Sequence, residues 1–356
     1  MVSSNVGSTQ GQPIIVQVST GRISRLFATI GWIGFLVCGF IVMRNYSDFQ
    51  QYYDNSGGIS ERYHSGDKEG TDKVAVLDIT GVIMSGEGYV KNQIDKIRND
   101  EAVKAIVLRI NSPGGTVTGS DYIYHHLTKL LEERKIPMVV SMGGLAASGG
   151  YYVAMAVGDQ KDCIFAEPTT TTGSIGVIIP HYDVSGLMEK YQVVDDSIST
   201  HPNKQMLSMT RPITDQQRTL IKGYIDYSFT RFKNIIMSGR PALKNDKNQL
   251  LGKGGLDLAT GEVFTAAQAK EHGLIDRIGF IEDAINRAVE LAGMDRATTR
   301  VIRFRRPATL FDMAGFAKSP AKGAFGRLDL NALFELSTPR AYFLASSLPP
   351  LVTTAR

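Results

Sequence analysis

Residues 143–152 read Gly-Gly-Leu-Ala-Ala-Ser-Gly-Gly-Tyr-Tyr and directly follow the apolar run Ile136–Met142. A short apolar run of this kind is typical of a buried strand, and the small residues after it predict a tight turn into a helix. Ser148 stands at that turn, where we expect its hydroxyl to face a cleft beside the backbone N–H groups of its neighbours. This arrangement suits a nucleophile next to an oxyanion site. In the alternative interpretation, Ser148 only caps the helix that follows.

Apolar runs and amphipathic segments alternate on both sides of this turn. Strands are predicted at residues 74–79, 105–110, 137–142 and 163–166, and helices at residues 89–99, 120–134, 149–157, 214–238, 265–273 and 279–291. This alternation predicts βαβ units around a mainly parallel sheet, an α/β fold. Functional loops then lie at the C-terminal ends of the strands. Both Asn111–Gly115 and Gly143–Ser148 follow predicted strands, which favours a functional role for Ser148.

The composition is that of a globular protein. The chain has 356 residues, of which 43% are hydrophobic and 21% charged, and its net charge of +4 is too small to indicate a nucleic-acid partner. The positive charge is concentrated in residues 296–356, which carry ten Lys or Arg against three Asp or Glu. We interpret this basic C-terminal segment as a solvated tail, with contact to anionic lipid or to a neighbouring subunit as the alternative.

The N-terminal region predicts a membrane anchor. Residues 26–43 carry no charge and are long enough to cross a hydrocarbon layer of roughly 30 Å. Residues 1–25 contain arginine but no acidic residue and are expected to be disordered, so the positive-inside rule places them in the cytoplasm and residues 45–356 outside. A cleaved signal peptide is the alternative. Residues 44–72 then form a polar linker, and residues 73–295 the main domain.

Cofactor chemistry is not indicated by the sequence. The two cysteines, Cys38 and Cys163, fall in the predicted span and in a soluble apolar segment, so no disulfide framework is expected. Neither a His-Glu-x-x-His motif nor paired cysteines occur, and Gly252–Gly255 lacks the spacing of a phosphate-binding loop. We therefore expect no metal and no nucleotide.

Four motifs in a fixed order carry a resemblance to a known family. They are Asn111-Ser-Pro-Gly-Gly115, Ala147-Ser-Gly-Gly-Tyr-Tyr152, Thr171-Thr-Gly-Ser-Ile-Gly-Val177, and Lys204 within Ser199–Leu207. Together they resemble the signal peptide peptidase A family, serine–lysine peptidases on a Clp/crotonase-like fold. The resemblance covers residues 72–295 approximately.

The resemblance implies a role for each matching residue. Ser148 matches the nucleophile and Lys204 the general base, while the backbone N–H groups of Gly115 and Gly149 match the oxyanion hole. Gly114 and Ser174 fall in the same substrate-binding motifs. The chemistry is consistent, because a serine needs a base to remove its proton and a lysine can serve only when burial favours its neutral form.

The family also implies a substrate class and an assembly. The expected function is a membrane-anchored endopeptidase that degrades cleaved signal peptides, with misfolded exported proteins as additional candidate substrates, and that assembles as a ring-like homo-oligomer. Because this chain carries a single copy of the unit, a neighbouring protomer is a candidate source of Lys204.

Several alternatives stay open. Gln205 replaces the acid that many relatives carry after the lysine, so a scaffold without catalysis is possible on the sequence. A Ser-His mechanism would draw on one of six histidines, namely His64, His125, His126, His181, His201 and His272. The apolar end, Ala341–Val352, could pack on a neighbour or dock in the cleft as a product.

Overall fold

The computed structural model describes residues 29–43, 58–245, 249–306 and 341–344. The chain divides into two units, residues 1–54 and residues 55–356. In the first unit, residues 29–43 form a helix whose apolar side chains are exposed. Within the described ranges, we find no helix with both the length and the apolar character needed to span a bilayer. Residues 26–28 of the predicted anchor, and the predicted disordered residues 1–25, lie outside the described residues.

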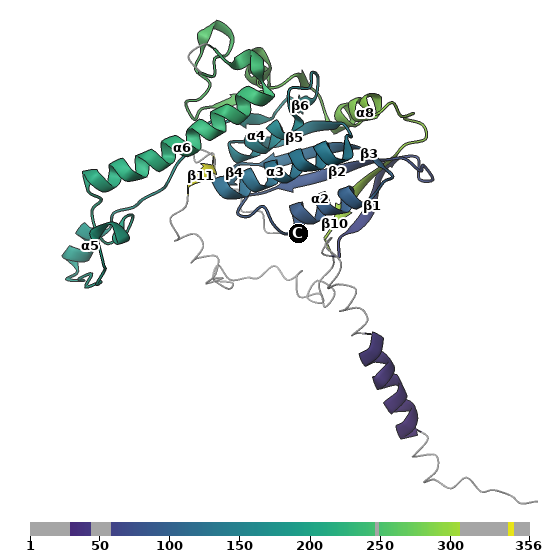
Figure 1. Ribbon diagram of the computed structural model, residues 1–356, viewed down its shortest axis with the longest axis horizontal. Helices are drawn as coiled ribbons and strands as arrows, with labels where there is room; N and C mark the ends of the chain where they lie inside the picture. Colours follow the sequence, from purple (N-terminus) through teal and green to yellow (C-terminus); the bar gives the residue numbers. More distant parts are fainter. Residues whose placement is uncertain (1–28, 44–57, 246–248, 307–340, 345–356) are drawn as a thin grey trace, which may run out of the picture. The chain divides into compact units, whose positions relative to one another are not determined.

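The second unit is built on a mainly parallel sheet (Figure 1). Its strands run in the order β1 (Ser60–Gly66), β10 (Arg300–Arg305), β2 (Lys73–Thr80), β3 (Val103–Ser112), β5 (Met138–Ala147), β6 (Ile164–Ala166) and β9 (Arg277–Ile278). Only the β1–β10 pair along this path is antiparallel. A branch adds β7 (Thr171–Gly173), parallel to the end of β5, and β8 (Val263–Thr265), antiparallel to β7. The predicted α/β class with a parallel-dominated sheet is confirmed.

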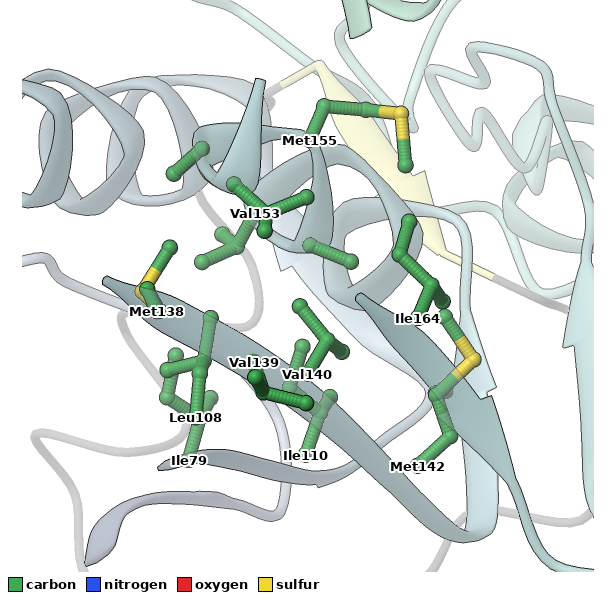
Figure 2. Close-up of a cluster of buried hydrophobic side chains, with 14 of the residues drawn as sticks. Ile79, Leu108, Ile110, Met138, Val139, Val140, Met142, Val153, Met155 and Ile164 are labelled. Atoms are coloured by element: carbon green, nitrogen blue, oxygen red, sulfur yellow. The ribbon is translucent and has the colours of Figure 1, made fainter. Parts of the chain in front are cut away.

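Helices bury the central strands. The helices α2 (Tyr89–Asn99), α3 (Val117–Arg134) and α4 (Gly149–Ala154) lie side by side over the sheet, and α8 (Ile281–Leu291) packs against β3 and β5 (Figure 1). Consecutive residues of β3 from Ala105 to Leu108 are therefore fully buried, as expected for a parallel strand covered on both faces. Figure 2 shows Val153 of α4 above the strands that carry Leu108, Val140 and Ile164.

Threonine side chains fix where several helices begin. Thr116 accepts a hydrogen bond from the Gly119 backbone at the start of α3. Thr214 and Thr265 form capping boxes at the starts of α6 (Asp215–Gly239) and α7 (Ala266–Glu271). Because each cap satisfies backbone N–H groups that have no partner within the helix, the helix starts are well defined by the sequence.

The segments predicted to be linker and tail contribute strands to the sheet, which corrects both interpretations. Within residues 44–72, β1 pairs with β10, while residues 44–57 lie outside the described residues. Within residues 296–356, β10 lies between β1 and β2 and buries Val301, Ile302 and Phe304. The basic residues of β10 made this segment look like a solvated tail in the sequence. In the structure, Arg303 forms an ion pair with Asp78 on β2.

A second, two-stranded sheet lies at the edge of the fold. β4 (Gly114–Thr116) pairs antiparallel with β11 (Tyr342–Leu344), which Figure 1 shows in yellow beside it. The Asn111–Gly115 motif and a segment more than two hundred residues later are therefore neighbours in space. Figure 1 shows α6 extending from α4 toward the short helix α5 (Ser185–Lys190), and η2 (Pro202–Gln205) lies between α5 and α6 in the sequence.

Candidate active site

Ser148 lies at a sharp turn between β5 and α4. Its backbone has φ of 53° and ψ of −115°, a left-handed region that a non-glycine residue rarely adopts. Two hydrogen bonds hold this conformation: the Ser148 N–H donates to the Gly173 carbonyl at 2.7 Å, and the Ser148 carbonyl accepts from Tyr152 at 2.8 Å. Strained backbone at a strand-to-helix turn is a recurrent feature of nucleophilic serines.

The hydroxyl of Ser148 is buried and unpaired. Ser148 has no exposed surface, and its Oγ has no hydrogen-bond partner among the described residues. The side chain makes no capping hydrogen bond to α4, so the helix-cap interpretation does not describe this serine. A buried hydroxyl without a partner is costly, which points to a role in chemistry rather than in stability.

Glycines bring backbone N–H groups close together beside the serine. A Cβ placed on Gly149 would come within 3.1 Å of the Gly115 nitrogen, so the two predicted oxyanion donors are neighbours. Gly114, with φ of 97°, packs against the same spot, because a Cβ there would lie 2.6 Å from the Gly149 nitrogen. The structure thus brings Ser148, Gly149, Gly114 and Gly115 together.

Ser174 follows the residue that bonds to Ser148. Its own φ is 52°, its backbone N–H donates to the Glu262 carbonyl at 2.6 Å, and its side chain is buried. The preceding carbonyl, that of Gly173, accepts the hydrogen bond from the Ser148 backbone. Ser174 therefore lies directly after the residue whose carbonyl holds the Ser148 turn, and its predicted role in substrate binding stays a prediction.

Lys204 is not joined to Ser148 within the single chain. It lies in η2, where its side chain is exposed, whereas the Ser148 Oγ is buried without a partner in the described ranges. Met206 and Leu207, which follow Lys204, line a cavity of about 800 Å³ together with Thr116 of β4, whereas Ser148 is not among the residues that line it.

The histidines, like Lys204, make no hydrogen bond to the Ser148 hydroxyl in the single chain. All six lie in described ranges, and none contacts the Ser148 Oγ through a hydrogen bond. The ring of His126 packs against Tyr122 on α3, and His181 bonds to the Ser208 carbonyl at 3.1 Å. Over the same part of the chain, no group of three or more potential metal ligands converges.

Two features of the site were not predicted from the sequence. Ser120 of α3 is buried, its Oγ has no partner among the described residues, and a Cβ on Gly149 would come within 2.4 Å of that oxygen. Tyr152 donates a hydrogen bond to Asp121 at 2.6 Å, and burial together with this carboxylate raises the pKa of the Tyr152 hydroxyl. No local pattern singles out Ser120, because its proximity to Gly149 arises only from the packing of α3 on α4.

Comparison with known proteins identifies the family. The sequence model described as Peptidase family S49 matches residues 131–295, and that of Clp protease matches residues 88–172. A Synechocystis sp. protein named "Putative protease slr0021" is 37% identical over 63% of this chain and 76% of its own length. The Enterococcus faecium protein named "Putative signal peptide peptidase SppA" is 34% identical over 69% of this chain and 70% of its own length. Protease 4 of Salmonella typhi is 36% identical over 62% of this chain and 34% of its own length. The chain therefore belongs to peptidase family S49 and is a serine endopeptidase.

Proposed function

We propose that this endopeptidase uses Ser148 as nucleophile and Lys204 as general base to degrade signal peptides left in the membrane after cleavage. The observation that carries the proposal is the strained turn at Ser148, whose unpartnered hydroxyl lies beside the Gly115 and Gly149 backbones. Backbone donors held in place before the reaction stabilise the oxyanion of an acyl transfer without reorganisation.

The proposed reaction has two steps. Lys204 removes the proton of the Ser148 hydroxyl as the oxygen attacks the peptide carbonyl, and the N–H groups of Gly115 and Gly149 stabilise the resulting oxyanion. The proton then passes to the leaving amine, and an ester on Ser148 remains. In the second step, Lys204 activates a water molecule that hydrolyses this ester.

A second copy of the chain is the proposed source of Lys204. Lys204 is exposed in the single chain and makes no hydrogen bond to the Ser148 hydroxyl, whereas contact with a neighbouring copy would bury it. The surface near Lys204 carries large apolar side chains in the open, including Ile198 at 99% exposure, Val194 at 82% and Tyr227 at 72%. Further exposed apolar residues in this region are Tyr182, Leu187, Tyr191, Leu220 and Tyr224. Apolar patches of this extent are rare on monomers and mark interaction surfaces.

The substrate class is inferred from the cleft and from the relatives. The 800 Å³ cavity beside β4 is lined mainly by apolar residues such as Met84, Ile179 and Leu220. An apolar cleft suits the hydrophobic core of a signal peptide, and the E. faecium relative carries the name of a signal peptide peptidase. We include the anchor at residues 26–43 and an orientation outside the cytoplasm in this proposal, because an anchor would hold the cleft near such substrates.

Labelling with a serine-reactive acylating probe tests the nucleophile. We expect the modification to map to Ser148, and Ser148→Ala to lower kcat/KM on an apolar peptide by roughly 10⁴-fold or more. Ser199→Ala, an exposed serine in the loop before η2, is the matched control and should retain activity. If Ser148→Ala still hydrolyses the peptide, Ser148 is not the nucleophile.

Mixed assemblies test whether the base comes from a neighbour. Ser148→Ala and Lys204→Ala protomers are each expected to be inactive, and co-assembly should restore part of the activity if one protomer supplies the serine and the other the lysine. Lys190→Ala, at the end of α5, serves as the matched lysine control. Activity that never returns on mixing would contradict the shared site.

A further inference from the structure

One edge of the sheet carries arginine side chains that share a face. This edge is formed by β1, the outermost strand, and by its neighbour β10 (Figure 1). Arg62 of β1 lies directly opposite Arg303 of β10, and Ser60 lies opposite Arg305. Side chains of directly opposed residues point to the same face, as do those of residues two apart in a strand. Arg62, Arg303 and Arg305 therefore project from one face of the sheet.

Carboxylates balance only part of this positive charge. Arg303 forms an ion pair with Asp78 at 2.5 Å, although its side chain stays 41% exposed. Arg62 and Arg305 are exposed, and neither has an ion-pair partner among the described residues. Like charges directly opposite each other destabilise a pair of strands. An anion that bridges the guanidinium groups of Arg62 and Arg303 would remove this repulsion.

The acidic residues near β1 lie away from the arginine face. Glu61, the one carboxylate within β1, is opposite Phe304 and pairs with Lys73 at 3.0 Å. The other nearby acids stand in residues 67–72, which follow the far end of β1. At the near end, where β1 begins and β10 ends, Arg306 adds another exposed guanidinium group. The positive charge is thus concentrated at one end of this edge.

The same end of the edge is the nearest in the chain to the predicted anchor. β1 begins at Ser60, seventeen residues after Met43, where the predicted anchor ends. A chain of that length reaches at most about 60 Å even when it is fully extended. An anchor in the bilayer would therefore keep the arginine face within that distance of the lipid headgroups.

We propose that Arg62, Arg303 and Arg305 form a docking surface for the phosphate groups of anionic phospholipids, which holds the β1–β10 edge on the membrane. This inference rests on the anchor that the proposed function includes, and it adds a second, electrostatic contact. Guanidinium groups suit this partner because each can donate two parallel hydrogen bonds to phosphate oxygens. Two points of contact fix the orientation of the peptidase unit on the bilayer, which a single anchor does not.

Fluorescence quenching in proteoliposomes tests this surface on the full chain. A fluorophore on Ser60→Cys, in a Cys38→Ala background, reports contact with lipids that carry a spin-labelled headgroup. At about 50 mM salt, we expect strong quenching in phosphatidylcholine vesicles with about 30% phosphatidylglycerol and little in phosphatidylcholine alone. At about 0.5 M salt, where exposed charges are screened beyond about 4 Å, this quenching should disappear.

Charge reversal gives the matched comparison. In Arg62→Glu/Arg305→Glu we expect the quenching that depends on anionic lipid to fall about tenfold or more, because each basic residue near a charged surface strengthens binding about fivefold. Lys104→Glu/Lys129→Glu changes the net charge equally at two other exposed positions and should keep the quenching. Both double variants should hydrolyse a soluble peptide in detergent at the wild-type rate. Equal quenching in the two kinds of vesicle, or quenching that survives the arginine reversal, overturns the inference.

Alkaline carbonate extraction separates this inference from the anchor. A segment that spans the bilayer stays in the vesicles during extraction, whereas a purely electrostatic contact is released. If the chain resists extraction but shows no quenching that depends on anionic lipid, the docking surface is refuted and the anchor stands. If the chain is extracted but binds anionic vesicles through these arginines at low salt, the anchor fails and the docking surface stands.

Discussion

At the residue scale, the site depends on backbone conformations that side chains normally avoid. Ser148 and Ser174 both adopt φ near +50°, and Gly114 has φ of 97°. Such residues cost on the order of 1–3 kcal/mol each when they are not glycine, and the surrounding hydrogen bonds must hold them. The strained turn at Ser148 directly precedes Gly149, whose backbone lies against that of Gly115.

The strain at Ser148 predicts a difference between two inactive variants. Ser148→Gly and Ser148→Ala both remove the hydroxyl, but only glycine adopts φ of 53° without steric cost. We expect Ser148→Gly to be about 1 kcal/mol more stable than Ser148→Ala in urea denaturation. Equal stabilities would show that this turn stores no strain.

Gly114 predicts a variant that folds but does not react. In Gly114→Ala the new methyl group would enter the space between the Phe343 carbonyl and the Gly149 nitrogen. We expect kcat/KM on peptides to fall by about 10²–10³-fold, the typical cost of a lost oxyanion donor.

The control for Gly114→Ala is Gly293→Ala. Gly293 also has a positive φ, of 65°, but a Cβ there would meet no atom within 4 Å. Gly293→Ala adds a methyl group at another positive-φ glycine without a steric clash and should keep normal activity. If both variants lose activity equally, backbone strain rather than a blocked site explains the loss.

At the element scale, most central strands and helices could be predicted from the sequence, whereas strands toward the edge of the sheet could not. The helix at residues 89–99 and the strands around β2, β3 and β5 are where periodicity placed them, because they bury regular apolar patterns. β10 was missed because Arg300, Arg303 and Arg305 alternate with its buried residues and resemble a solvated basic run. The position of β10 in the sheet depends on pairing with strands that are distant in the sequence, and local sequence patterns do not indicate such pairing.

The candidate site also contains residues that the sequence predicts and residues that it does not. Ser148 and the glycines of the Ser-Pro-Gly-Gly turn were predictable, since they stand in local motifs at strand ends. Ser120 and the pairing of Phe343 with Gly115 were not, because both depend on segments that only tertiary packing brings together.

The loop that carries Lys204 is held by Asp195. This carboxylate accepts hydrogen bonds from the Ser197 backbone at 3.0 Å, from Thr210 at 2.5 Å and from Arg211 at 2.9 Å. Arg211 also donates to Gln205, the residue after the lysine, at 2.5 Å. Asp195→Asn removes the charge at the centre of this network, so we expect kcat/KM to fall several-fold while probe labelling of Ser148 is retained.

The pH dependence of this loop has a defined sign. Hydrogen bonds from Ser197 and Thr210 hold the pKa of Asp195 well below its usual value of 3.8. A lowered pKa in the folded state means that the stabilisation is present above about pH 4 and is lost only as the pH falls through the lowered pKa. Wild type and Asp195→Asn should therefore differ throughout pH 5–7, while Asp162→Asn, which alters an exposed ion pair with Arg277, should match wild type. If the difference in kcat/KM between wild type and Asp195→Asn disappears as the pH falls from 7 to 5, this account is contradicted.

At the scale of the whole molecule, one partly buried carboxylate joins separate parts of the fold. Asp276, just before β9, forms an ion pair with Arg240 at the end of α6 at 2.6 Å. It also accepts the backbone N–H groups of Cys163 and Ile164, both at 2.9 Å, where β6 begins. The contact thus ties α6, which forms a wall of the cleft, to the edge of the sheet.

Loss of this carboxylate should weaken the entire unit. Asp276→Ala leaves the partly buried Arg240 charge, whose side chain is 11% exposed, without its partner, so we expect the free energy of unfolding to fall by about 2–3 kcal/mol in urea denaturation. Asp162→Ala breaks an exposed Asp–Arg pair instead and should cost less than about 1 kcal/mol. Similar losses in the two variants would mean that the Asp276 contact is no more than a surface ion pair.

The position of β10 determines when the sheet can be completed during synthesis. β2 and β3 leave the ribosome early, yet the strand that separates β1 from β2 begins only at Arg300. At synthesis rates of about 5–20 residues per second, β2 waits on the order of ten to forty seconds for its neighbour. During that interval its open edge is available to other strands, so a nascent chain of this protein has a particular need for a chaperone or for rapid passage to its destination.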